Sequence, residues 1–273
     1  MKTIFVFLLS LGFVLVSCTS PAQTQTPTPR ANPLDIPWED RSIFKGGLVE
    51  SAQSILEGLS GASVYHIEFN IDEDLYHISG QQEVHYTNTE SVALEQVAFR
   101  LFPNILGGRM EVSNLVAGGQ SVTPEFQLKD SLLLVPMPAP LAPGQSIVIG
   151  MDFKVTVPQS VELNYGVLSY SEDVLALAHA YPMIAVYDDE GWNAEIPPQS
   201  GDVTYADASF FLVKITAPAG LTLVTTGKEI DRSSEGNTQT VFIANGPARD
   251  FYLAASPLYE ETVETFGEIT IRS

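Results

Sequence analysis

Residues 147–157 read IVIGMDFKVTV, the longest stretch of regular alternation in the chain. Apolar side chains stand at every second position: Ile147, Ile149, Met151, Phe153, Val155 and Val157. Successive side chains of a β-strand point to opposite faces of its sheet, so this spacing gives the strand one apolar face and one more polar face. Such a strand is typical of an antiparallel sheet that is packed on one side.

The same period of two recurs along the chain. It is found at Tyr65, Ile67, Phe69 and Ile71, at Ile78, Val84 and Tyr86, and at Val97, Phe99 and Leu101. Turn-forming residues separate the runs, at Asn88-Thr89, Gly107-Gly108, Gly118-Gly119, Ala142-Pro143-Gly144 and Pro197-Pro198. Short strands between such breaks predict an all-β domain over residues 62–273, a large antiparallel β-sandwich or saddle-like sheet.

One segment before this domain has helical spacing. Its apolar residues recur at intervals of three or four and are Leu48, Ala52, Ile55, Leu56 and Leu59. We therefore predict a short amphipathic helix from Gly47 to Leu59, within a helical segment of residues 45–61. Its apolar stripe is expected to cover the β-domain.

The first 17 residues have the features of a lipoprotein signal peptide. An apolar run from Ile4 to Val16 follows Lys2 and is too short to cross a bilayer. The sequence LVSC at residues 15–18 resembles a bacterial lipobox, and Cys18 is the single cysteine. We predict lipidation of Cys18 and a lipid-anchored, extracytoplasmic location in the bacterial cell envelope. The alternative is an ordinary cleaved signal with an incidental cysteine.

Composition restricts the partners. Residues 18–44 are predicted to be a disordered tether, because most of this segment is rich in Pro, Thr and Gln and poor in apolar residues. The chain carries 33 acidic and 13 basic residues, a net charge of −20. A surface of this charge repels phosphate backbones, so we expect a membrane contact through the lipid anchor and no nucleic acid partner.

Five blocks of sequence resemble the N-terminal β-domain of aminopeptidase N-like zinc metallopeptidases, the gluzincins of the membrane alanyl aminopeptidase family. They are YHIEFNID at 65–72, FRLFPN at 99–104, PLAPG at 140–144, ARDF at 248–251, and the long stretch 181–218 that contains YDDEGW. The resemblance extends roughly from Tyr65 to Ser273. It implies a non-catalytic β-domain that forms one side of a peptide-binding cleft, with the catalytic domain in the following part of the protein.

The zinc motif of that family is missing from this chain. H-E-x-x-H places two imidazoles one helical turn apart beside a general-base glutamate. The four histidines are His66, His77, His85 and His179, no two are four residues apart, and none precedes a glutamate. We therefore expect no catalytic residue, metal ligand or cofactor here. Zinc is expected only in a missing catalytic domain, which the β-domain would contact if one exists.

An acidic loop at residues 187–192 is the candidate substrate-side element. In the resembling family, an acidic loop of the β-domain often lends a polar side chain to the pocket for the substrate's amino terminus. Asp188, Asp189, Glu190 and Trp192 occupy the corresponding region, without the prolines that flank the family's loop. A solvated turn and a calcium site are the alternatives for these carboxylates.

Two further groups of residues admit more than one interpretation. His77 and His85 are expected on the outward face, on neighbouring strands where they could bind a metal, or else as solvated surface histidines. Five aromatic residues are either a platform for a sugar or peptide or part of the core: Tyr165, Tyr170, Tyr187, Trp192 and Tyr205.

The preferred hypothesis is the N-terminal β-domain of a membrane-anchored metallopeptidase-like lipoprotein, in a partial chain. The alternative is a complete cell-surface binding lipoprotein that recognises a peptide, a glycan or a partner protein.

Overall fold

The computed structural model describes residues 32–162, 164–196, 204–267 and 269–272. The predicted signal peptide, the lipidation site Cys18 and the first part of the tether lie outside the described residues. So does the predicted turn at Pro197-Pro198. In the part of the chain that is described, no helix is long and apolar enough to cross a membrane.

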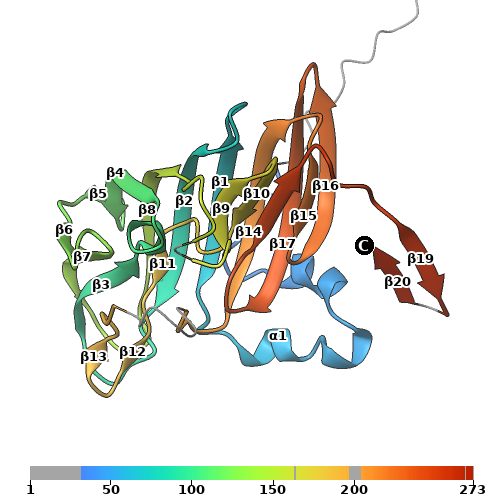
Figure 1. Cartoon of the computed structure of the whole chain (residues 1–273). Helices are drawn as coiled ribbons and strands as arrows, with labels where there is room; N and C mark the ends of the chain where they lie inside the picture. Colours follow the sequence, from blue (N-terminus) through green and yellow to red (C-terminus); the bar gives the residue numbers. More distant parts are fainter. Residues whose placement is uncertain (1–31, 163, 197–203, 268, 273) are drawn as a thin grey trace, which may run out of the picture. The chain divides into compact units, whose positions relative to one another are not determined.

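The largest sheet has eight strands in the order β16-β17-β14-β1-β2-β8-β4-β5 (Figure 1). Their bounds are β1 Val64–Ile71, β2 His77–Thr87, β4 Arg109–Ala117, β5 Gln120–Ser121, β8 Ser146–Thr156, β14 Ser209–Pro218, β16 Lys228–Glu235 and β17 Thr238–Ala248. Neighbouring strands are antiparallel except β1 and β14, which run parallel with Val64 opposite Phe210. The predicted strand at residues 147–157 is β8, paired with β2 and β4.

Two four-stranded sheets accompany the large one. Their orders are β15-β18-β10-β9 and β11-β3-β7-β6. The bounds are β3 Leu94–Arg100, β6 Glu125–Gln127, β7 Leu132–Leu141, β9 Leu168–Ser171, β10 Val174–Leu177, β11 Met183–Ile184, β15 Thr222–Thr225 and β18 Leu253–Ser256. Two hairpins complete the fold: β12 Tyr187–Asp188 with β13 Gly191–Trp192, and β19 Val263–Phe266 with β20 Ile269–Arg272. A short 3-10 turn, Phe102–Asn104, follows β3.

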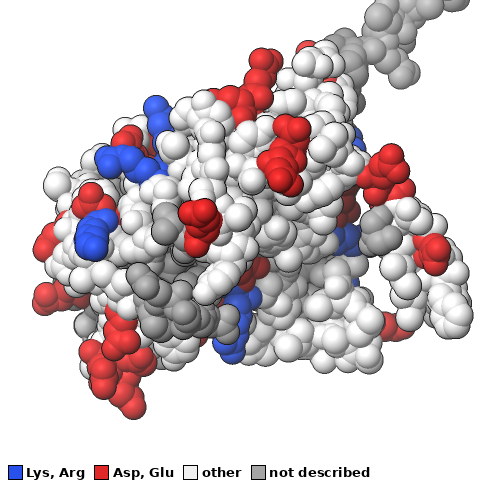
Figure 2. All heavy atoms as spheres, viewed as in Figure 1, with Lys and Arg blue, Asp and Glu red and all other residues white. Residues whose placement is uncertain are grey.

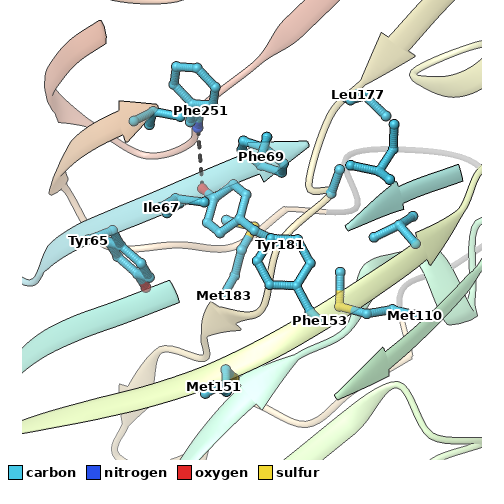
Figure 3. Close-up of a cluster of buried hydrophobic side chains, with 14 of the residues drawn as sticks. Tyr65, Ile67, Phe69, Met110, Met151, Phe153, Leu177, Tyr181, Met183 and Phe251 are labelled. Atoms are coloured by element: carbon cyan, nitrogen blue, oxygen red, sulfur yellow. Dashed lines mark hydrogen bonds between the residues drawn. The ribbon is translucent and has the colours of Figure 1, made fainter. Parts of the chain in front are cut away.

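The inner face of the eight-stranded sheet packs against both smaller sheets. The apolar rows predicted from the alternation supply this core: Ile67 and Phe69 from β1 and Phe153 from β8 are all buried. Tyr181 lies among them, and its hydroxyl accepts a hydrogen bond from the Phe251 amide at 3.2 Å (Figure 3). The prediction of an all-β fold is confirmed.

The predicted helix from Gly47 to Leu59 is wrong in extent. This region contains the end of a 3-10 helix at Ser42–Gly47, a second 3-10 turn at Glu50–Ala52, and one helical turn, α1, at Ile55–Gly58. The paired glycines at 46 and 47 favour a break, since glycine is a poor helix former.

Packing, more than helix propensity, determines the path of this segment. Phe44 and Leu56 form a second apolar cluster with Val64, Phe210 and Leu212 on the outer face of the large sheet. Residues 33–62, here called the covering segment, therefore bury one end of that face. Leu48, Leu56 and Leu59 of the predicted stripe take part and Ile55 is exposed, whereas Phe44 comes from the segment predicted to be a disordered tether. The strands β1 and β14 are consequently buried on both faces where they begin.

Candidate functional site

The acidic loop is a tight hairpin. Tyr187 pairs with Trp192 and Asp188 with Gly191, which leaves Asp189 and Glu190 as the turn. The Glu190 amide donates to Asp188 Oδ1 at 3.0 Å. Gly191 has a φ of +102°, in a region that favours glycine. The predicted solvated turn is therefore a defined β-turn that holds Trp192 opposite Tyr187.

Trp192 lies in an aromatic corner. Its ring meets the Tyr187 ring edge-on at 5.1 Å between centroids and the Tyr86 ring at 6.1 Å. Tyr86 comes from the end of β2, so the hairpin is attached to the large sheet through aromatic contacts. Edge-to-face packing of this kind restricts the orientation of the indole.

A cleft of about 410 Å³ opens beside this corner, and we call it the aromatic cleft. The hairpin, the beginning of β1, the end of β2, strand β11 and the approach to β14 form its walls. Its aromatic lining consists of Tyr65, Tyr86, Tyr187, Trp192 and Phe211. Its charged lining consists of Glu90, Asp207 and Arg249. The cleft thus combines five aromatic side chains with two carboxylates and one cation, an arrangement suited to a ligand with apolar and charged parts.

The two buried tyrosines of the cleft remain neutral. Burial raises the pKa of Tyr65 well above its usual value, and the charge of Asp207 adds to the increase. Burial likewise raises the pKa of Tyr86, helped by the charges of Glu90 and Asp207. The Tyr65 oxygen accepts a hydrogen bond from the Ile184 amide at 3.0 Å. The phenols therefore act as hydrogen-bonding walls, while Glu90 and Asp207 supply the negative charge.

A second, more acidic cleft of about 350 Å³ lies on the other side of Trp192. Asp188, Glu190 and Glu195 line it, together with Gln127 and Asn193. Acidic side chains gather over the β12–β13 hairpin on the surface (Figure 2). Asp189, at the turn, lines neither cleft. The structure thus brings Trp192 into both clefts and Asp188 and Glu190 into one.

Neither metal interpretation gains support from the described residues. In the described ranges, no three His, Cys, Asp or Glu side chains are placed to hold a metal ion. His77 and His85 lie on one strand, β2, eight residues apart, so the expectation of neighbouring strands is wrong. His77 pairs with Asp74 at 2.7 Å, and the His85 ring stacks on Trp38 at 5.7 Å.

The five predicted aromatic residues do not form one platform. Tyr165 is 79% exposed, and Tyr205 is exposed without lining the aromatic cleft. Tyr170 stacks on Tyr76 with 6.4 Å between ring centroids, and Tyr76 directly precedes β2. Tyr170 therefore lies at the opposite end of β2 from Tyr86 and the aromatic cleft. Only Tyr187 and Trp192 belong to the aromatic cleft.

Sequence reasoning missed Tyr65 and Tyr86 as cleft residues. Both were assigned correctly to the inner rows of their strands. Their positions at the strand ends nearest the hairpin place them in the cleft. That information comes from the pairing of β1 with β2, where Tyr65 stands opposite Val84.

The sequence matches no family model and no curated protein. Solved structures are similar in fold. An M1 zinc metallopeptidase mutant from Deinococcus radiodurans superposes with a TM-score of 0.53 at 17% identity, over 77% of this chain and 46% of that one. A two-domain M1 zinc metallopeptidase mutant bound to L-tryptophan gives 0.53 at 16% identity, over 78% and 46%. The Deinococcus mutant bound to a Tyr-Ser-Ala substrate gives 0.51 at 18%, over 77% and 46%.

The chain spans less than half of the length of these structures. At such identities the likeness is one of fold, and it agrees with the fold that the sequence resemblance implied. The β-rich architecture described here is therefore one that occurs within M1 zinc metallopeptidases.

Proposed function

We propose that this chain is the non-catalytic N-terminal β-domain of a membrane-anchored, metallopeptidase-like lipoprotein with aminopeptidase character. The carrying observation is the unequal coverage of the superpositions, 77% of this chain against 46% of the metallopeptidase. The described residues also hold no candidate metal group, which is consistent with a zinc site located in another domain.

In this role the aromatic cleft forms the substrate-side wall of a peptide site. An apolar side chain of the peptide packs on Trp192 and Tyr86, and its amino group lies near Glu90 and Asp207. The residues lining the cleft support this assignment, since aromatic faces bind apolar groups and carboxylates attract a cation. Among the structures of similar fold, one M1 zinc metallopeptidase mutant is bound to a Tyr-Ser-Ala substrate and another to L-tryptophan.

Intrinsic fluorescence tests the cleft. The chain contains two tryptophans, so Trp38→Phe leaves Trp192 as the only indole and makes emission a reporter of the cleft. In this background Tyr-Ser-Ala should change the emission saturably, and its N-acetylated form should bind more weakly. Asp207→Asn should weaken binding about tenfold, the effect of roughly 1.4 kcal/mol of lost charge interaction.

The matched control is Asp189→Asn, which removes a carboxylate from the same hairpin at a position that lines neither cleft. It should bind like the parent. An unsaturable response, or equal weakening by both substitutions, refutes the peptide role. Peptide hydrolysis by the purified chain that a histidine substitution abolishes would refute the non-catalytic assignment.

The membrane anchor has its own test. The full chain expressed in a bacterium should partition into the detergent phase after lipid attachment. Cys18→Ser should return it to the aqueous phase. Partitioning that is unchanged by the substitution contradicts lipidation at Cys18.

A binding lipoprotein without a catalytic partner is the second candidate. It is favoured by the aromatic cleft, whose lining comes entirely from this chain, from the covering segment and from the β-domain. The same fluorescence titration with an oligosaccharide separates the two. Saturation by the sugar, with no response to the peptide, supports this candidate.

A further inference from the structure

Arg100, the last residue of β3, is a buried arginine without a counter-ion in the described chain. Its side chain stands in the FRLFPN block, which has no assigned role. The residue is 5% exposed, and both Nε and Nη2 are buried without a hydrogen-bond partner in the described protein. Nη1 donates to the Asn193 carbonyl oxygen at 3.4 Å, longer than an ordinary N–H···O bond. The guanidinium is thus mostly unsatisfied.

The surroundings of this guanidinium are apolar. Arg100 lies opposite Leu132 on the neighbouring strand β7. It shares the outer face of β3 with Ala98, two residues earlier, and both Ala98 and Leu132 belong to a small buried apolar cluster. The guanidinium carbon lies 5.2 Å from the centre of the Phe102 ring. Burial alone lowers the pKa of Arg100, with no acidic side chain contributing. Arg100 therefore lacks both the solvent and the negative charge that ordinarily stabilise a cation.

Another partly buried arginine shows the difference. Arg41 lies 4.5 Å over the Phe210 ring, and burial lowers its pKa as well. However, the charges of Glu39 and Asp40 oppose that change, and its Nη1 donates to the Trp38 carbonyl. The covering segment thus supplies negative charge close to Arg41, although the Nε of Arg41 is also buried without a partner in the described chain. No acidic side chain of the described chain does the same for Arg100.

The unsatisfied atoms have a specific geometry. Nε and Nη2 lie on one edge of the guanidinium plane, and their N–H groups point in nearly parallel directions. A carboxylate accepts both in a bidentate pair, the geometry for which arginine is preferred over lysine. Because the guanidinium is buried, the attraction within such a pair is screened less than at the surface.

We propose that Arg100 anchors a binding site for the carboxylate group of a small ligand, on the outer face of β3 beneath the segment that follows β13. The ligand's two oxygens accept hydrogen bonds from Nε and Nη2. The one polar contact that the described chain makes with the guanidinium is the 3.4 Å bond from Nη1 to the Asn193 carbonyl, which leaves Nε and Nη2 to bind the ligand. Arg100 lines neither the aromatic cleft nor the acidic cleft, so this proposal does not rest on the proposed peptide role, although Asn193 also lines the acidic cleft.

Thermal unfolding of the full chain with sodium acetate, against sodium chloride at equal ionic strength, tests the site. Acetate should raise the unfolding temperature saturably. Arg100→Met, which keeps the apolar stem and removes the charge, should abolish the acetate response, with at least a tenfold loss of affinity. Without acetate this variant should be no less stable than the parent, since it removes an uncompensated cation.

The matched control is Arg109→Met, at an exposed arginine paired with Glu111 at 2.8 Å. It changes the net charge equally and should keep the acetate response. An acetate effect of the same size in parent and Arg100→Met overturns the proposal. Stabilisation by phosphate and not by acetate also overturns it, because the ligand class is then wrong.

A second measurement uses the unmodified protein, so it does not depend on whether a variant folds. The Nε–H resonance of Arg100 in a ¹⁵N-labelled parent should move and saturate with acetate, at the concentration that gives half of the thermal effect. A resonance that does not move during the titration contradicts binding at this guanidinium.

Discussion

The two faces of β1 hold buried polar side chains in opposite states. On the inner face, Tyr65 accepts a hydrogen bond from Ile184, and the neighbouring Tyr181 hydroxyl donates to Asp250 Oδ1 at 2.8 Å. On the outer face, His66 stacks on Trp38 at 4.1 Å, and its buried Nε2 has no hydrogen-bond partner in the described chain. The hydrogen bonds of the inner-face tyrosines therefore join segments that are distant in the sequence. The unpaired imidazole nitrogen on the outer face instead lowers the stability of the fold.

The largest effect is expected on the inner side, from Asp250→Ala. Its carboxylate accepts from the Tyr181 hydroxyl and from the Phe251 amide at 2.7 Å, and its Oδ2 lies 2.7 Å from His179 Nδ1. Removing it leaves the buried Tyr181 hydroxyl without its acceptor and takes one partner each from the Phe251 amide and His179 Nδ1. The free energy of unfolding should therefore fall by about 3–5 kcal/mol. Urea denaturation followed by circular dichroism measures this loss.

Asp250→Asn is the conservative control. The amide keeps an acceptor for Tyr181 and Phe251 and should recover a large part of the stability. Asp74→Ala, at the exposed pair with His77, should cost no more than about 1 kcal/mol. Equal losses in all three variants would show that the inner network has no special weight.

A smaller effect is expected on the outer face, and it depends on pH. Burial lowers the pKa of His66 to about 4, against about 6.5 in the unfolded chain. Stability from a depressed histidine is fully present above the unfolded pKa and is lost as the pH falls toward the folded pKa. Between pH 7 and pH 4.5 this histidine alone should reduce the free energy of unfolding by about 2–3 kcal/mol.

His66→Phe should remove this acid-dependent loss while keeping a ring against Trp38. Other groups titrate in the same window, so the comparison is the difference between variant and parent at the two pH values. If His66→Phe loses as much stability as the parent on acidification, the outer imidazole does not titrate as described.

The smallest effect concerns packing on the inner face, at Gly80 in β2. A Cβ there would lie 2.2 Å from the Phe153 ring and 2.7 Å from the Glu68 carbonyl oxygen. Gly80→Ala should therefore destabilise the domain by about 1–3 kcal/mol through overpacking. Gly150→Ala in β8, where the nearest atom is 3.7 Å away, is the control and should change stability little. Thermal unfolding compares the two, and equal losses would contradict this account of the inner face.

Much of the fold could be predicted, because alternation is a local property. The row from Ile147 to Val157 indicated the long strand β8. The helix from Gly47 to Leu59 was not predictable in its extent. Its path depends on the contact of Phe44 with Phe210, two residues far apart in the sequence.

The candidate site was predicted only in part, because it also depends on contacts between residues that are far apart in the sequence. Trp192 stood out in its acidic loop, and it does line a cleft. The partners that make the cleft, Tyr65 and Tyr86, carry only the signal of a buried row. Arg100 was noticed within a motif, but its lack of a counter-ion is visible only after the chain is folded.

The parallel pairing of β1 with β14 has a consequence for how the domain assembles. Every other neighbour in the large sheet is antiparallel, yet this central pair joins Val64 to Phe210 across most of the chain. Closing so long a loop is entropically slow, and contacts of high sequence separation go with low folding rates. The edge of β1 that pairs with β14 therefore has no partner until β14 has been synthesised, and an unpaired strand edge is a general site of aggregation in nascent chains.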